Sequence, residues 1–106
     1  MLLGGIFLNS MYVRDVSSEF GKYADTLSHP TEEAVLSLEE YWYKHRDGLG
    51  LSISGVYLDS IEKTIVSMRS AYESGDVKEF RKNLALFRQS SEVIGKSERI
   101  SLEIIL

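Results

Sequence analysis

Apolar side chains recur at alternating intervals of three and four residues along most of this chain. No stretch alternates apolar with polar residues over the length of a strand. An α-helix turns once every 3.6 residues, so this spacing places the apolar side chains on one face of each helix. Such a face must pack against another helix. The sequence therefore predicts an all-α fold, an up-down antiparallel bundle of three to four helices.

The first two stripes flank a proline. Their residues are Val13, Val16, Phe20, Tyr23 and Leu27, then Val35, Leu38, Trp42 and His45. Asn9 or Ser10 can cap the first helix, and Pro30 ends it because the residue before a proline is pushed out of the helical region. Gly48 and Gly50 predict a stop or a kink after the second helix. Glycine costs a helix only about 1 kcal/mol, so the number of helices depends on whether the chain breaks there.

The third stripe is the longest. Its residues are Leu51, Ser54, Leu58, Ile61, Ile65, Met68 and Tyr72. This narrow seam is typical of near-parallel or antiparallel helix packing. After it, Gly75 suits the left-handed position that follows a helix, and Asp76 can cap the next one. Glu79 lies three residues after Asp76, which predicts a reciprocal capping arrangement.

The fourth stripe is wide, because two rows of apolar residues run along it. One row is Phe80, Leu84, Phe87 and Ile94, and the other is Leu86, Val93, Ile100 and Ile104. A face of this width is expected of a helix that packs against two partners.

The composition excludes several classes of protein. A chain of 106 residues is the size of one domain and can bury a core without cross-links. It has no cysteine, so disulfides, thiolate catalysis and cysteine-ligated zinc are excluded. The net charge is −4, and the most basic stretch, residues 78–88, also carries Glu79. Nucleic-acid binding requires a concentrated positive surface, so we expect no nucleic-acid partner.

The N-terminus is unusual, because residues 1–13 carry no charge and the first eight are strongly apolar. The run is shorter than a membrane span of about 20 residues and lacks the basic start of a secretory signal. It is either a frayed or docked tail or the end of a membrane anchor, since glycines in an apolar run suit a membrane helix. We therefore divide the chain into an apolar stub, residues 1–10, which could tether the protein to a membrane, and one bundle domain, residues 11–106.

The sequence contains no recognisable catalytic or metal-binding motif. Neither His29 nor His45 follows a glutamate by three residues, so the Glu-x-x-His pairs of di-metal bundles are missing. Gly-x-Ser-x-Gly elements and phosphate-binding loops are missing as well. We expect no catalytic residue, no cofactor and no metal site.

Tyr41, Trp42 and Tyr43 form the most notable cluster. Consecutive helical residues point about 100° apart, so the three cannot all face one core. Trp42 belongs to the apolar stripe, whereas the two tyrosines flank it and are expected to be half exposed. Tyr and Trp are enriched at interfaces, which makes Tyr41, Trp42, Tyr43 and His45 a candidate binding surface. The alternative is packing at the edge of the core.

Four features follow one another in a characteristic order: Trp42, the segment Tyr57-Leu58-Asp59-Ser60-Ile61-Glu62, the turn at Gly75 and Asp76, and the end Ile104-Ile105-Leu106. In this order the chain, from about residue 13 onward, resembles the bacterial family named domain of unknown function 4363. The resemblance implies structural roles for Trp42, Leu58, Asp59 and Ile61. It also implies an N-terminal membrane anchor and a helical part outside the cytoplasmic membrane, and it implies no enzymatic activity. The chain departs from the family pattern near Gly55, where a histidine is typical, and at Glu103, where asparagine is common.

These observations predict a non-enzymatic helical module that has a structural role or contacts an unidentified protein partner at the bacterial cell envelope. One alternative is a small-ligand-binding bundle or an enzyme with a cavity near Trp42 and His45. Another is a homo-oligomer that uses the apolar face of the fourth helix. A soluble cytoplasmic location is the alternative to an anchored one.

Overall fold

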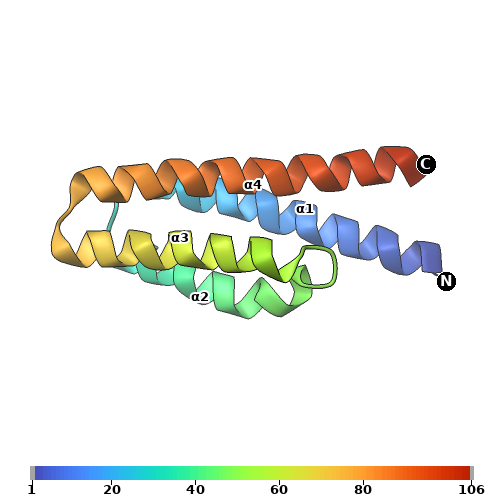
Figure 1. The fold of residues 1–106 in the computed structure, drawn as a ribbon, viewed down its shortest axis with the longest axis horizontal. Coiled ribbons are helices and arrows are strands. Elements are labelled where there is room, and N and C mark those ends of the chain that lie inside the picture. Colours follow the sequence, from blue (N-terminus) through green and yellow to red (C-terminus); the bar gives the residue numbers. More distant parts are fainter. Residues whose placement is uncertain (1, 106) are drawn as a thin grey trace.

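Four helices account for nearly all of the chain in the computed structural model (Figure 1). They are α1 (Leu2–Thr26), α2 (Glu32–Leu49), α3 (Gly55–Ser74) and α4 (Val77–Ile105). The structure describes the backbone of residues 2–105 and the side chains of residues 11–96. Each helix contacts its neighbours in the chain, and α4 also contacts α1, which closes the ring. The predicted all-α, up-down bundle is confirmed, with four helices.

Side-chain caps start α2 and α3. The Thr31 hydroxyl accepts a hydrogen bond from the Ala34 amide at 3.1 Å, and the Ser54 hydroxyl accepts one from the Tyr57 amide at 3.3 Å. Each bond pairs an amide that has no partner within the first turn of its helix.

The helix is interrupted between α2 and α3, which is one of the two outcomes predicted for residues 48–50. Leu51 was expected to head the third stripe, but this prediction is wrong: Leu51 lies in the loop, 80% exposed, because α3 starts only after the Ser54 cap.

The turn between α3 and α4 has the predicted conformation. Gly75 has a φ of 73°, the left-handed region that glycine enters without steric cost. Asp76 caps α4, because its carboxylate accepts a hydrogen bond from the Glu79 amide at 3.0 Å. The Glu79 carboxylate accepts a hydrogen bond from the Asn83 side chain at 3.3 Å, one turn further along, in place of the predicted bond back to Asp76.

The first helix begins earlier than its capping signals predicted. α1 starts at Leu2 and continues through Asn9 and Ser10, so neither residue caps it. A capping residue permits a helix to start but does not stop one that is already formed. Among the described residues, no helix combines the length and apolar character that crossing a membrane requires. The side chains of residues 1–10, on which the predicted anchor depends, lie outside the described part.

One apolar face from each helix contributes to a single core. Its buried residues are Val13, Val16, Phe20, Ala24, Leu27, Val35, Leu38, Trp42, Leu49, Leu58, Ile61, Ile65, Met68, Ala71, Phe80, Leu84, Phe87 and Ile94. Most of them belong to the predicted stripes, including the complete first row of α4, whereas Ala24, Leu49 and Ala71 belong to none. The period of 3.6 residues therefore located the core correctly.

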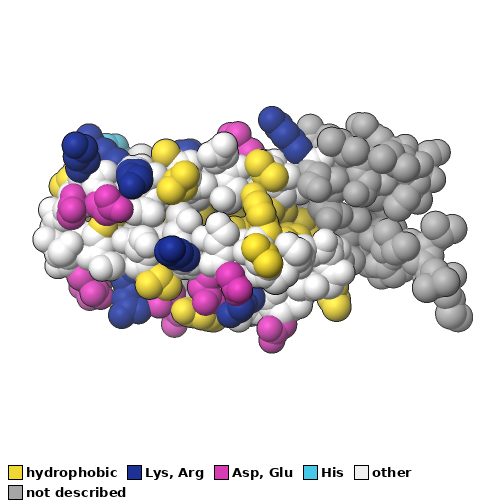
Figure 2. All heavy atoms as spheres, in the orientation of Figure 1, with side chains coloured by type: hydrophobic (Ala, Val, Ile, Leu, Met, Phe, Trp, Pro, Cys, Tyr) yellow, Lys and Arg dark blue, Asp and Glu magenta, His cyan; other side chains and the backbone are white. Residues whose placement is uncertain are grey.

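The second row of α4 does not pack as predicted. Leu86 and Val93 stay about half exposed, and Figure 2 shows exposed apolar side chains on the face that α3 and α4 form. Asn83 and Ser91 are buried on α4 instead, so part of the helix's second contact is polar. The side chains of Ile100 and Ile104 lie outside the described residues. The homo-oligomer that would use this face remains a prediction.

The helices differ in length, and this gives the bundle two unlike ends. α1 and α4 are the longest, and both extend past the loop that joins α2 to α3, so both chain ends lie on that side (Figure 1). At the opposite end the loop from α1 to α2 lies near the turn from α3 to α4. We call this the closed end.

Candidate functional site

The structure divides the four side chains of the predicted aromatic surface, because Tyr41 and His45 stay in contact whereas Trp42 and Tyr43 lie elsewhere. Trp42 is completely buried in the core, and its indole N–H donates a hydrogen bond to Glu62 at 2.9 Å. Tyr41 faces Tyr23 on α1 and also packs against His45 on its own helix, where the two ring centroids are 4.3 Å apart. Tyr43 points outward and is 53% exposed. Of the four, only Tyr43 is well placed to contact another molecule.

His45 joins α2 to α1 through a hydrogen bond. The Tyr12 hydroxyl lies 2.5 Å from Nδ1 of His45. Burial, and then the charge of Lys44, lower the pKa of His45, which favours a neutral ring whose Nδ1 can accept a hydrogen bond from the Tyr12 hydroxyl. Gly48 provides the room for this contact, since a Cβ there would lie 2.8 Å from the Tyr12 oxygen.

Tyr41 completes this aromatic contact between α1 and α2. Its ring packs 5.2 Å from Tyr23 and 5.8 Å from Phe20, measured between ring centroids. Burial, followed by the charge of Glu19, raises the pKa of Tyr41 to about 12. The phenol therefore stays neutral far above physiological pH and serves here in packing between the helices.

A polar network connects α2 with α3 beside the buried tryptophan. Glu62 accepts hydrogen bonds from the Trp42 indole and from Arg46, the latter at 2.8 Å. Arg46 also pairs with Asp59 at 2.9 Å. Asp59 is exposed, whereas Leu58 on the same helix is buried in the core, as is Ile61.

A second ion-pair group lies further along the same two helices. Arg69 on α3 pairs with Glu39 on α2 at 2.7 Å and with Glu73 at 3.1 Å. Glu39 lies between Leu36 and Tyr43, which are seven residues apart and therefore share a face of α2. Val66 lies one turn before Arg69. We call Leu36, Tyr43, Val66 and Arg69 the α2–α3 surface.

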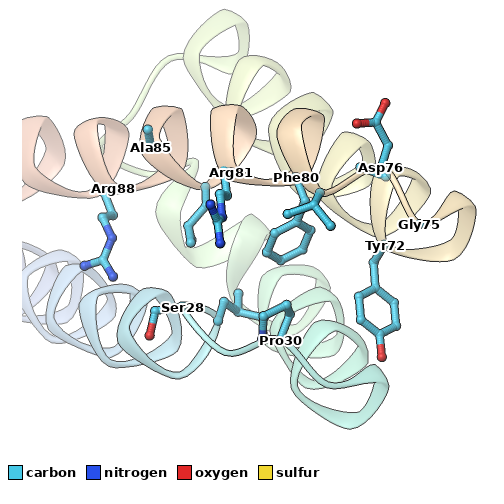
Figure 3. Close-up of a pocket in the computed structure, with 13 residues that line it drawn as sticks. Ser28, Pro30, Tyr72, Gly75, Asp76, Phe80, Arg81, Ala85 and Arg88 are labelled. Carbon is cyan, nitrogen blue, oxygen red and sulfur yellow. The ribbon is translucent and has the colours of Figure 1, made fainter.

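A hollow of about 600 Å³ opens at the closed end (Figure 3). It lies between the loop that follows α1, the end of α3 and the first three turns of α4. Much of its wall is apolar, formed by Leu27, Pro30, Ala71, Phe80 and Leu84. Figure 3 shows Phe80 and Arg81 pointing from α4 toward the loop at Pro30, whereas Asp76 points away.

Two arginines border this hollow, and their surroundings differ. Arg88 is tied to α1, because its guanidinium pairs with Asp25 at 2.9 Å and donates to the Ala24 carbonyl at 3.0 Å. Arg81 is exposed and has no ion-pair or hydrogen-bond partner among the described residues. Arg81 therefore brings an unneutralised positive charge to the hollow.

The apolar stripes could not reveal this hollow, because its residues come from two segments, 27–30 and 71–88, that are far apart in the sequence. One feature of the sequence does point to this part of α4. Arg81 and Arg88 are seven residues apart on one helical face, with the small Ala85 between them. Two arginines on one helical face place positive charge where an anionic group could bind.

The described residues contain no group of three or more histidines and carboxylates placed to hold a metal ion. No protein-family model, curated protein or solved structure matches this chain significantly.

Proposed function

We propose that this chain is a non-enzymatic helical module that acts by contact with a protein partner through the α2–α3 surface. One observation supports this most strongly. Tyr43 is 53% exposed, and Leu36 and Val66 are each 45% exposed. Leu36 and Arg69 line the same shallow hollow. Tyrosine and arginine are the side chains that most often carry binding energy at protein interfaces.

The arginine of this surface is fixed before any partner arrives. Glu39 and Glu73 both pair with Arg69 and restrict its guanidinium. A side chain that is already ordered loses less entropy on binding, so more of the contact energy remains as affinity. A place at the bacterial envelope is part of the proposal through the family resemblance and the uncharged residues 1–13.

Photo-crosslinking in cells tests this proposal. Tyr43 is replaced by p-benzoylphenylalanine, and the matched control carries the same group at the exposed position of Arg14 on α1. We expect a discrete adduct from position 43 only, and its loss when Leu36 and Val66 are both changed to serine. Such exposed changes alter stability by about 0.5 kcal/mol each, so the bundle stays folded.

The mass of the adduct identifies the partner class. An adduct of two copies of this chain would point to a homo-oligomer. An adduct that forms equally from position 14, or that persists after the Leu36 and Val66 substitutions, would contradict a specific contact at the α2–α3 surface.

A small-ligand-binding bundle is the second candidate. The closed-end hollow favours it, because its volume is within the range of about 300–1,000 Å³ that small-molecule sites occupy. This hollow lies away from Trp42 and His45, the position suggested by the sequence, and neither residue lines it.

A further inference from the structure

We propose that the closed-end hollow binds a single-chain amphiphile with a carboxylate head, of the fatty-acid class. Its alkyl chain would lie against Phe80, Leu84 and Pro30, and its carboxylate against Arg81. This site is separate from the α2–α3 surface, so either proposal can fail without the other.

The walls of the hollow suit an alkyl chain. Leu27 and Pro30 come from the loop after α1, and Phe80 and Leu84 come from α4, so an occupant would contact apolar atoms from both segments. Each methylene that leaves water for such walls adds to the affinity. The volume of about 600 Å³ is too small for a folded partner and is typical of a small-molecule site.

The hollow exists before any ligand binds. Ala71 and Ala85 present only methyl groups to it, and Gly75 presents no side chain. Pro30 restricts the backbone of one bordering loop, and hydrogen bonds from the Gly75 and Asp76 amides to the last turn of α3 hold the other. A ligand would therefore fill existing space, which avoids the cost of opening a packed core.

The charged side chains around the hollow determine which head group the ligand should carry. Arg88 is engaged by Asp25, and Asp76 points away while it caps α4, which leaves Arg81 as the unpaired charge. A guanidinium matches a carboxylate in shape and charge through two parallel hydrogen bonds. The chain as a whole has a net charge of −4. An anion would therefore be favoured at Arg81 specifically rather than over the general surface.

Titration of the full chain with three ligands of equal length tests this proposal. Decanoate, decanol and decylammonium are added below the concentrations at which they aggregate, near neutral pH. Nuclear magnetic resonance follows the methyl groups of Leu27, Leu84 and Ala85 and the Nε of Arg81. We expect saturable shifts at these groups, with decanoate binding about fivefold more tightly than decanol and decylammonium the weakest.

Two matched variants isolate the charge. Arg81→Gln should remove the advantage of decanoate over decanol. Lys82→Gln removes the same charge one residue later, outside the hollow, and should keep the advantage. Arg81 has no partner to lose, so the thermal midpoint of Arg81→Gln should equal that of the wild type. Ala85→Phe should fill the hollow and weaken all three ligands more than tenfold.

Three results would overturn the proposal. One is the lack of saturable shifts at the three methyl groups. Another is equal binding of decanoate and decylammonium. The third is a decanoate advantage that survives in Arg81→Gln. Crosslinking from position 43 should be unchanged in Arg81→Gln, which keeps failure here distinct from failure of the proposed protein contact.

Discussion

Ser17 on α1 and Ser91 on α4 exchange hydrogen bonds across the helix interface. The Ser17 hydroxyl donates to the Ser91 carbonyl at 2.8 Å, and the Ser91 hydroxyl donates to the Ser17 carbonyl at 3.0 Å. Gly95 lies beside them, and a Cβ there would be 2.8 Å from the Ser17 oxygen. Small side chains thus let the two longest helices approach closely, and the serine pair joins them in addition to the contacts of Arg88 with Asp25 and Ala24.

Removing one of these hydroxyls should weaken the bundle. Ser91→Ala deletes a buried hydrogen bond, and we expect the free energy of unfolding to fall by about 1 kcal/mol. Urea denaturation measures the change. The control is Ser18→Ala, an exposed position on the same helix as Ser17, where a change within about 0.5 kcal/mol is expected. Equal effects of the two substitutions would contradict a stabilising role for the serine pair.

Two glycines in helix interiors should respond oppositely to alanine. At Gly21 nothing lies within 4 Å of an added Cβ, so Gly21→Ala should stabilise the protein by about 0.5–1 kcal/mol through helix propensity. At Gly48 the new Cβ would be 2.8–2.9 Å from the Tyr12 ring, which must move and lose its bond to His45. Gly48→Ala should therefore destabilise it. Thermal melts compare the two, and a gain in stability for both would refute the proposed contact.

Acidification should reduce stability through His45. Its folded-state pKa is lowered from 6.5, first by burial and then by Lys44, so the unfolded chain takes up this proton more readily than the folded one. The stabilisation is present above about pH 6.5 and is lost as the pH falls through the folded-state pKa. Urea denaturation at about pH 7.5 and about pH 5.5 should show this loss. This loss of stability should be smaller in His45→Gln and should persist in His29→Gln. A loss of the same size in His45→Gln would contradict its attribution to His45.

Glu62 should matter more to stability than Asp59, although both pair with Arg46. Glu62 also accepts the N–H of the fully buried Trp42, and Glu62→Ala would leave that donor unpaired. We expect a cost of about 1–3 kcal/mol. Asp59 is exposed, so Asp59→Ala should cost about 0–1 kcal/mol. Denaturation followed by Trp42 fluorescence measures both, and the opposite order would show that the indole bond contributes little.

The core was predictable because burial follows helix periodicity. Residues such as Phe20, Trp42 and Ile65 lie at the expected intervals and are buried. Leu51 also fits the interval, but periodicity does not say where a helix starts, and the Ser54 cap decides this. Leu86 also lies at a helical interval, yet it remains half exposed. The sequence pattern shows which residues can pack, but it does not show how many neighbouring helices they can pack against.

The candidate sites were harder to predict, because they depend on contacts between distant residues. Gly48 was interpreted as a helix stop, yet it lies inside α2 and makes room for Tyr12, which is 36 positions away in the sequence. Tyr41 and Tyr43 were grouped by adjacency, but Tyr41 packs toward α1 while Tyr43 faces solvent. The hollow combines two turns with one helix face, and no local pattern encodes that arrangement.

The shared location of both chain ends has a practical consequence. α1 begins and α4 finishes at the same end of the bundle (Figure 1), whose longest dimension is 49 Å, and the hollow is lined by the turns at the other end. Either terminus can therefore carry a label, a sensor surface or a fused protein. Most of the length of the molecule would separate that attachment from the mouth of the hollow. The proposed amphiphile should therefore reach the hollow of immobilised protein as freely as that of protein in solution.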